Sequence, residues 1–492
     1  MPRCILLVFL SALLVLAQSN SGRLSGTVSD SSGAPMPGVA LIVTNPQTGF
    51  KQETTSQENG FYVFPSLPSG TYSLSAERTG FGSQKNDNIV LDASSSRSVD
   101  VTLSPGSVSE TVSISASAQQ VETTTGEVSS TINNRQVTDV ALNGRNFMQL
   151  LRLVPGTVAT TLDPLAVGLS TTGQQVNGVR TNIDARVDGV ANVDAGGNIS
   201  QRSTPNPDAI EEVKVLTSGY NAEYGGRAGA LMNVVTKSGT RNFHGTLFEF
   251  VRNSAFDARN FFSATPSILH FNDYGWTVGG PVFVPRKFNT DRSKFFFFWS
   301  EEWKFQHTGT TVTGLVPTEA EKAGNFNGSR LAAPVDPTTN LPFPNATVPS
   351  SRWSKNGPLL LKPYPVANFN SPAGNYTVTT PAVTDPREDL VKGDWIVSDN
   401  TRIGARWSQA YWTQRAAVNN TIGIVTADTP RPSYLTSINI THSFSPSLLN
   451  YTTFGAGFDA FLATAHPDQF TKSALGLTIP PSILARADEV IE

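Results

Sequence analysis

The composition of this chain of 492 residues favours an exported, mainly β protein. Charged residues make up only 15%, against about 25% in a typical soluble domain. Glycine (40 residues) and phenylalanine (28 residues) are abundant, and a chain rich in aromatic, Gly, Ser and Thr residues favours strands and turns over helices. The net charge of -3 provides no basic surface, so we expect no nucleic-acid partner.

Residues 1–17 have the layout of a secretory signal peptide. Arg3 gives a basic start, and the apolar run at residues 4–16 is too short for a membrane helix of about 20 residues. Small residues around the cleavage position predict a mature N-terminus at Gln18. A membrane anchor is the alternative, which the length and the flanks disfavour. Cys4, the only cysteine, lies in the apolar run, so the mature chain would lack disulfides and thiolate metal sites.

Residues 22–104 show period-2 alternation interrupted by turn clusters, which predicts a small β-sandwich of about seven strands. The pair Asn59-Gly60 predicts a hairpin between two of these strands. The stretches SGTVSDSSGAPMPGVALIVTNPQTGF and ENGFYVFPSLPSGTYSLSAERTGF resemble the carboxypeptidase regulatory-like domain. This resemblance implies an Ig-like, carbohydrate-binding-like β-sandwich, and it does not imply peptidase activity.

Nothing in the sequence predicts an enzyme, a metal site or a cofactor. The histidines are widely separated and none has metal-ligand spacing; they are His244, His270, His307, His442 and His466. The sequence shows neither a Gly-rich phosphate loop after a buried strand nor a nucleophile elbow. We therefore expect a protein that is not an enzyme and that has no cofactor.

Residues 105–130 are predicted to be a linker that contains one segment of strand-like pattern. This segment consists of Glu110, Thr111, Val112, Ser113, Ile114, Ser115 and Ala116. Such a segment can add as a strand to the exposed sheet edge of a partner. ETVSISA resembles the TonB box of TonB-dependent outer-membrane transporters, although Ser113 and Ser115 stand where that family often has Val and Thr. The resemblance implies contact with TonB of the inner-membrane energy-coupling complex; the alternative is an extended linker.

Residues 131–237 combine a helical segment with short strands. Apolar residues have helical spacing from Val137 to Leu153, with a break at Asn143-Gly144. We expect Gly144, Gly189 and Gly225 to serve backbone geometry and not ligand contact. Together with PDAIEEVKVLTSGYNAEYGGRAGALMNVVTKSGT, these segments resemble the α+β plug domain of TonB-dependent receptors. LNGRNFMQLLRLVPG and TKSGTRNFHGTLFEFVRN are similar to the Oar-like branch of that family.

Residues 238–492 contain strand segments with one apolar face and one small or polar face, which is typical of an antiparallel outer-membrane β-barrel. Seven strands are predicted, at roughly 244–252, 272–282, 294–313, 389–397, 402–412, 434–443 and 448–459. The connections between them alternate long and short, as extracellular loops and periplasmic turns do. Residues 314–388 are predicted to form the longest loop, in which Asn325 stands where the family usually has Asp.

Plugged transporters have about 22 barrel strands, and seven strands cannot close around a plug domain. The sequence is therefore expected to be an N-terminal fragment or a truncated reading frame, with a partial barrel. The leading interpretation is a TonB-dependent receptor or transporter for a large substrate in the cell outer membrane, with its N-terminal domain in the periplasm.

Three partners are implied by this interpretation: TonB, outer-membrane lipid, and an unidentified substrate for which both an oligosaccharide and a peptide remain open. The alternative function is a surface adhesin or a carbohydrate-binding outer-membrane protein, with the sandwich as the working module. The plug signature and the alternation of loop lengths separate the two functions, because an adhesin needs neither.

Overall fold

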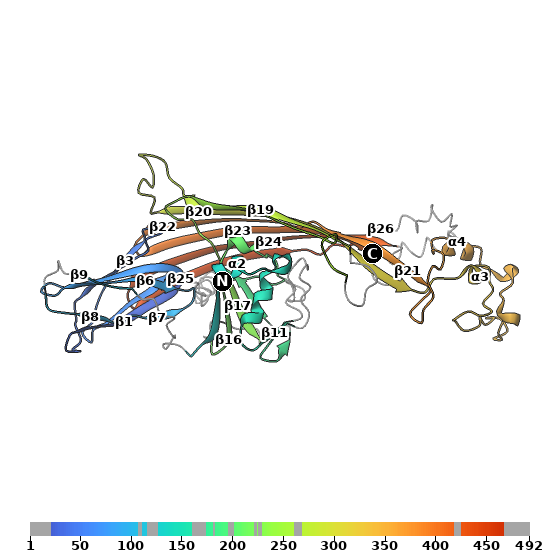
Figure 1. Cartoon of the computed structure of the whole chain (residues 1–492), viewed down its shortest axis with the longest axis horizontal. Helices are drawn as coiled ribbons and strands as arrows, with labels where there is room; N and C mark the ends of the chain where they lie inside the picture. The colour runs from blue at the N-terminus through green and yellow to red at the C-terminus, as the bar shows by residue number, and fades with distance from the viewer. Residues whose placement is uncertain are drawn as a thin grey trace, which may run out of the picture.

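The computed structural model describes residues 21–106, 111–115, 126–159, 174–180, 183–194, 201–220, 224, 229–259, 268–417 and 425–466. Within these ranges the chain forms a β-sandwich, a middle unit of strands and short helices, and one large antiparallel sheet (Figure 1). This arrangement confirms the predicted mainly β fold class. Among the helices of these ranges, none is both long and apolar enough to cross a bilayer. The predicted signal peptide lies outside the described residues.

The sandwich consists of two sheets around one apolar core. One sheet contains β4 (Phe61–Leu67), β1 (Gly22–Asp30), β7 (Ser96–Ser98) and β8 (Val101–Leu103). The other has the order β3 (Lys51–Thr55), β2 (Ala40–Thr44), β5 (Gly70–Glu77), β6 (Ser83–Leu91) and β9 (Thr111–Ser115). Both sheets contribute fully buried side chains, among them Tyr62 and Tyr72. The alternation seen in the sequence therefore places one face of each sheet in a shared core.

The hairpin predicted at Asn59-Gly60 is wrong. A tight turn does form there, with Gly60 at φ +77° and its N–H donated to the carbonyl of Gln57 at 2.9 Å. The strands on either side belong to different sheets, because β3 pairs with β2 and β4 pairs with β1. The Asn-Gly pair identifies a place where the backbone turns with positive φ, and it does not determine which strands pair.

The middle unit is built on a five-stranded sheet. Its strand order is β10 (Val128–Asn133), β16 (Ile210–Ser218), β17 (Ala230–Thr236), β14 (Ile183–Val187) and β15 (Val190–Ala191). A smaller sheet contains β11 (Thr157–Ala159), β12 (Gln174–Val176) and β13 (Val179–Arg180). The helices α2 (Asn134–Asp139) and η3 (Phe147–Leu153) contribute Val137, Phe147 and Leu150 to the core of the larger sheet. This is the α+β arrangement that the sequence predicts.

The helical spacing before Pro155 gives three short helical pieces and not one helix. α2 begins with a capping box between Asn133 and Gln136, which satisfies the first free N–H groups. Gly144, inside the short helix η2 (Asn143–Arg145), has φ +67° and interrupts the helical backbone where the sequence predicts a break. Gly189 also has positive φ, +83°. Gly225 lies outside the described residues.

The large sheet confirms the seven predicted strand positions. Its strands are β18 (His244–Asn253), β19 (Leu269–Pro281), β20 (Phe295–Gly314), β21 (Tyr376–Thr384), β22 (Arg387–Ser398), β23 (Thr401–Ala417), β24 (Thr426–Ser445), β25 (Leu448–Asp459) and β26 (Thr464–His466). These nine strands fill seven positions, because β21 and β22 both pair with β20, and β25 and β26 both pair with β24.

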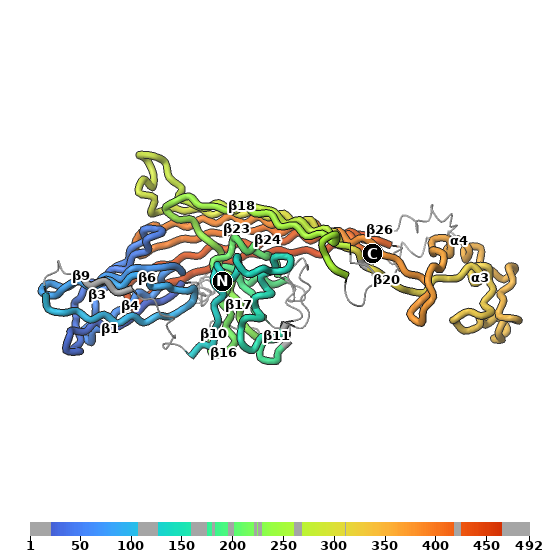
Figure 2. Tube along the Cα trace, in the orientation of Figure 1, coloured from blue at the N-terminus to red at the C-terminus, as the bar shows by residue number. Residues whose placement is uncertain are grey.

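One strand of this sheet contradicts the predicted loop at residues 314–388. β21 lies inside that range, and its nine residues pair antiparallel with the C-terminal part of β20, residues 306–314. The connection itself therefore covers residues 315–375 and contains α3 (Glu319–Lys322), η5 (Pro344–Ala346), η6 (Ser350–Arg352) and α4 (Gly357–Leu361). It lies at the opposite end of the sheet from the sandwich (Figures 1 and 2).

The two faces of the large sheet differ in the way that the sequence predicts. Tyr274, Trp299 and Trp407 are 38%, 41% and 39% exposed on the outer face. On the inner face, neighbours such as Asp273 and Arg406 are buried. An apolar outer face with a polar inner face is the pattern of a barrel wall in lipid.

The sandwich provides a test of this fold. We expect residues 21–106 to fold alone, because both of its core-forming faces lie within that segment. Gly26→Ala should destabilise the segment by about 1–3 kcal/mol, since an added Cβ would lie 2.0 Å from the carbonyl oxygen of Val99. That oxygen also accepts the hydroxyl of Tyr62. Chemical denaturation followed by circular dichroism measures the change.

Lys51→Ala is the control for this measurement, because Lys51 is exposed in a strand of the same domain. We expect it to change the free energy of unfolding by less than about 0.5 kcal/mol. Equal stability of the Gly26 and Lys51 variants would contradict the close approach of β1 to residue 99.

Candidate functional site

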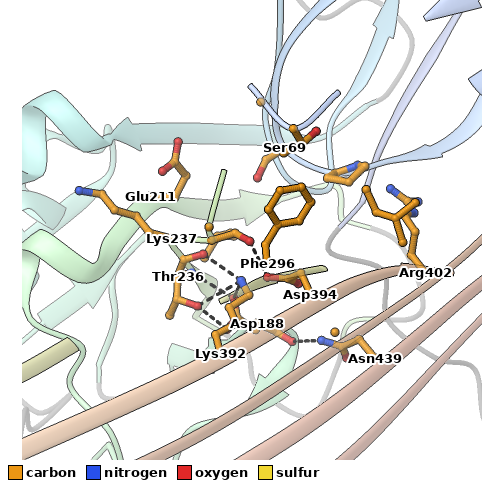
Figure 3. A pocket seen from close by; sticks show the side chains of 18 of the residues that line it. Ser69, Asp188, Glu211, Thr236, Lys237, Phe296, Lys392, Asp394, Arg402 and Asn439 are labelled. Carbon is orange, nitrogen blue, oxygen red and sulfur yellow. Dashed lines mark hydrogen bonds and ion pairs between the residues drawn. The ribbon is translucent and has the colours of Figure 1, made fainter. Parts of the chain in front are cut away.

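The middle unit lies against the inner face of the large sheet (Figure 1), and buried charges connect the two. Asp188, in the turn between β14 and β15, is the centre of the first connection. Its carboxylate lies 2.9 Å from Nε of Arg406 and 3.7 Å from Nζ of Lys392. It also accepts the backbone N–H of Thr236 at 3.0 Å and the hydroxyl of Thr236 at 2.7 Å. Figure 3 shows Asp188, Thr236 and Lys392 in contact, with Asn439 beside them.

These partners decide the charge of Asp188. Burial alone would raise the pKa of its carboxyl group, but Lys392, Arg406 and the two hydrogen bonds from Thr236 hold the pKa below its usual range. Asp188 is therefore ionised although it is only 3% exposed. A buried carboxylate of this kind is stable only while its cationic partners stay in place. Separating the middle unit from the sheet at this point would leave charges on both sides unpaired.

Arg145 makes a second connection. Its guanidinium pairs with Asp208 of the middle unit at 2.5 Å and lies 3.4 Å from Asp273 of β19. It also lies over the rings of Phe248 and Phe250 of β18, at 4.3 Å and 4.2 Å from their centroids. One arginine therefore contacts carboxylates from both units and two aromatic faces, a combination suited to its planar, permanently charged group.

A third connection holds the segment that follows residue 200. Glu388 of β22 accepts the hydroxyl of Ser203 at 2.7 Å, and the N–H and hydroxyl of Thr204 at 2.8 Å each. Asn206 donates to the hydroxyl of Ser300 in β20 at 2.5 Å. The middle unit is thus bound to β18, β19, β22 and β23 of the sheet through charged side chains, and to β20 through the hydrogen bond of Asn206.

The sandwich is bound to both other units. Arg402 at the start of β23 donates to the carbonyl and the hydroxyl of Ser66, at 2.7 Å and 2.9 Å, and its guanidinium lies 5.2 Å from the centroid of Phe50. On the middle unit, Lys214 donates to the carbonyl of Ser94 at 2.6 Å. Glu212 accepts the backbone N–H of Ala93 at 2.5 Å. The sandwich is therefore held at the end of the sheet where β22 and β23 are joined.

A cavity of about 560 Å³ lies where the three units meet (Figure 3). The sandwich lines it with Ser69 and Phe50, the middle unit with Glu211 and Lys237, and the sheet with Asp394 among others. Its walls combine both signs of charge with few aromatic groups. Across the described ranges, no group of His, Cys, Asp and Glu is arranged to hold a metal ion.

The segment predicted to contact TonB is a strand in the structure. Thr111–Ser115 form β9, which runs parallel to β6 with Ser83–Asp87 as its partners. Glu110 and Ala116 lie outside the described residues. The extended conformation agrees with the predicted pattern, but the strand partner is the sandwich of the same chain. The sequence pattern does not predict this pairing, because the two strands run parallel and their paired residues, such as Ser83 and Thr111, are not joined by a tight turn.

The sequence pattern did not point to the residues that make the charged contacts between the middle unit and the sheet. The signal that could have found them is the alternation itself. Arg406 and Glu388 stand at inward positions of strands that expose large apolar residues, such as Trp407 and Val391, on the other face. A charged group at an inward position needs a partner inside the protein. Their partners, Asp188 and Ser203, are far away in sequence, so no spacing connects them.

The connection at Asp188 gives a stability prediction. We expect Arg406→Met to destabilise the folded protein by about 3–5 kcal/mol, because it leaves Asp188 buried without its nearest cation. Arg415→Met is the control on the same strand, since Arg415 forms an ion pair with Asp428 in an exposed position. That change should have little effect. Urea unfolding in detergent, followed by tryptophan fluorescence, compares the two; equal effects would contradict a buried connection.

Glu212 gives a pH prediction. Burial, followed by repulsion from Asp92, raises the pKa of its carboxyl group from 4.5 to about 8. Between these two pH values the folded state holds a proton that the unfolded state has lost. Stability therefore falls as the pH rises through this window, and the full cost is present above it. Glu212→Gln keeps an acceptor for Ala93 and should flatten this part of the profile.

Thermal unfolding at a series of pH values measures the effect of Glu212→Gln. Glu53→Gln, at an exposed position of β3, is the matched control and should keep the slope of the unchanged protein. If the Glu212 variant kept the same slope as well, another group would be responsible for the pH dependence.

Three family models match the chain in consecutive order. Residues 23–104 match the carboxypeptidase regulatory-like domain, residues 120–230 the TonB-dependent receptor plug domain, and residues 235–488 the outer membrane beta barrel domain. The TonB-dependent transporter Oar of Myxococcus xanthus is 26% identical over 314 residues. That match covers 60% of this chain and 28% of Oar, so the chain spans less than a third of this curated relative.

Solved outer-membrane proteins are similar over the greater part of the chain. The transporter YddB from Escherichia coli has 12% identity and a TM-score of 0.40, covering 69% of this chain and 40% of YddB. The siderophore receptor PirA from Acinetobacter baumannii has 14% identity and a TM-score of 0.34, covering 68% of this chain and 45% of PirA. The barrel family model alone matches more than half of the chain. The chain thus belongs to the TonB-dependent outer-membrane receptors, carries an N-terminal carboxypeptidase regulatory-like domain and is similar to Oar.

Proposed function

We propose that this protein is a transporter of the outer membrane, and that TonB energises it through residues 110–116. The observation that carries the proposal is that the middle unit, the plug, is held to the barrel wall by buried ion pairs. Asp188 with Arg406, and Arg145 with Asp273, are two of them. Moving such a plug requires work, because separated buried charges lose their partners. A partner that binds the chain just before the plug can supply this work.

The connections between strands support one orientation of the protein in the membrane. β22 and β23, and likewise β24 and β25, are joined by two residues at one end, whereas residues 315–375 connect β20 and β21 at the other. Short turns of outer-membrane barrels face the periplasm and long loops face the exterior. Because Arg402, next to a short turn, binds Ser66 of the sandwich, we assign the N-terminal domain and residues 110–116 to the periplasm.

The proposed activity is transport without catalysis. The substrate is a large solute, and oligosaccharides and peptides are the two classes to test first. The cavity of about 560 Å³ lies between sandwich, plug and wall, on the side that we assign to the periplasm. A solute that passes the plug would leave through this space. Because its walls contain both Lys237 and Glu211, it does not favour one sign of substrate charge.

Ile114→Pro tests the role of TonB in the receptor expressed at full length. Proline removes one main-chain donor and fixes φ, so it should prevent continuous strand pairing at residues 110–116. Loss of a ladder hydrogen bond with an unsatisfied acceptor corresponds to a decrease in TonB binding of roughly tenfold or more. Ile114→Ala keeps the main-chain donor and should reduce binding by less than about threefold.

Two measurements decide the outcome. The first is TonB-dependent uptake of the substrate by cells, and the second is crosslinking of single cysteines at positions 110–116 to TonB. We expect crosslinks in the unchanged protein, fewer in the proline variant, and uptake that falls in parallel. Equal uptake of the proline and unchanged forms, together with an absence of crosslinks, would show that the segment is only a linker.

A further inference from the structure

The segment proposed to bind TonB is already paired in the structure. β9 (Thr111–Ser115) lies beside β6 in the order β3-β2-β5-β6-β9, with Lys85 opposite Ser113 and Asn86 opposite Ile114. Of its two edges, one is therefore occupied by the sandwich. A strand that adds to another protein through main-chain hydrogen bonds uses the same kind of contact that β6 now provides.

The part of β6 that faces β9 is polar. It consists of Ser83, Gln84, Lys85, Asn86 and Asp87. The buried apolar residues of β6, Ile89 and Leu91, belong to the core of the sandwich and pair with β5, beyond the end of β9. The segment of β6 that binds β9 therefore contributes no side chain to this core cluster.

Two buried polar side chains of β6, Gln84 and Asn86, have partners within the sandwich. Gln84 donates to Asn86 at 3.0 Å and accepts the backbone N–H of Thr102 at 3.1 Å. Removing β9 would thus leave these side-chain contacts intact. What joins β9 to the sandwich is a parallel ladder of five residues at a sheet edge. Parallel pairs are slightly less stable per residue than antiparallel ones, so this ladder is suited to reversible pairing.

How TonB would use β9 depends on which contacts transmit a pulling force to the plug. While β9 stays on β6, a pull on β9 acts on the sandwich. The sandwich is itself bound to the barrel through Arg402 and Ser66, and to the plug through Lys214 and Ser94. The pull would then be carried by the barrel wall, and the plug would not move relative to it. Only after β9 leaves β6 does a pull reach the plug along the chain.

We propose that the regulatory-like sandwich holds the TonB-binding segment in reserve, and that β6 and TonB compete for β9. This inference rests on the proposed function of residues 110–116. The sandwich is then an inhibitory domain, whose β6 edge is the competing binding site. TonB binds the chain by replacing β6 as the partner of β9. A pulling force reaches the plug only after this exchange.

A crosslink between β6 and β9 tests the exchange in the full-length receptor. Lys85→Cys with Ser113→Cys places thiols at partner positions of the two strands, and Lys85 is exposed. The sequence has one other cysteine, Cys4, in the predicted signal peptide. The matched control is Ala40→Cys with Thr55→Cys, which joins β2 and β3 at exposed partner positions and leaves β9 free. If oxidation does not form a disulfide in a pair, a short bifunctional thiol reagent crosslinks the two cysteines instead.

The readout is capture of the C-terminal domain of TonB by a photo-crosslinking residue at position 112. With the 85–113 pair closed, we expect capture to fall at least tenfold and to return when dithiothreitol opens the disulfide. The closed control pair should stay within twofold of the unchanged protein. Capture that is unaffected by the closed 85–113 pair would mean that TonB adds to the outer edge of β9, which overturns the exchange.

The remaining outcomes separate this inference from the proposed function. If the 85–113 pair cannot be closed by either route while TonB is still captured, β9 does not rest on β6; the inference is then wrong and the proposed function stands. If TonB is captured by none of the proteins, even with all cysteine pairs reduced, the proposed function itself fails, and the competition fails with it.

Discussion

The inner face of the barrel wall carries charged side chains, and most of the architecture follows from this constraint. Asp273, Glu388 and Arg406 are buried there, whereas Tyr274 and Trp407, the neighbours of Asp273 and Arg406 along their strands, are exposed on the outer face. A charge on the inner face of a membrane wall must find its partner inside the protein. The plug provides these partners through Arg145, Ser203 and Asp188. Wall and plug are therefore specified together.

The need to pair buried polar groups also explains why the sandwich has one defined position against plug and wall. Its core packs against Ile396 of β22, and its backbone satisfies polar groups at the place where plug and wall meet. Arg402 of the wall and Lys214 of the plug each donate to a backbone carbonyl of the sandwich. Such contacts depend on geometry more than on area. A small domain can thereby keep one orientation at this end of the sheet, and a change of protonation at Glu212 acts directly on its contact with Ala93.

The sequence predicts the strands of the barrel well because each one combines length with strict alternation. It fails for β21, whose sequence YTVTTPAVT has few large apolar residues and contains Pro381. Such a segment is identified as a strand only by its partner β20. The Asn59-Gly60 turn was located correctly, but the pairing around it depends on the core of the whole sandwich. β9 was predicted as extended, while its neighbour β6 was not predicted, since parallel pairing leaves no local signal.

The sequence could predict that charged contacts exist at the candidate site, but not which residues make them. Inward charges in β22 and β23 indicate that partners exist. Their identities depend on how the plug is seated, which requires tertiary structure. Asp188 follows a buried strand and precedes Gly189, and the sequence alone favours a turn there. Its role as the carboxylate between Arg406 and Lys392 becomes evident only when the two units are seen together.

The order of strands in the plug has a mechanical consequence. β10 is the first strand of the plug along the chain and also the edge of its sheet, whereas Asp188 lies in the turn beside β15, at the opposite edge. A tension that enters at Val128 first loads its pair with Ser218. The ladder between β10 and β16 can then open stepwise from that end, while the fully buried β17 keeps its place. The β10 edge of the plug sheet can separate without breaking the ion pair of Asp188 at the opposite edge. A passage could then open while the plug remains in the barrel.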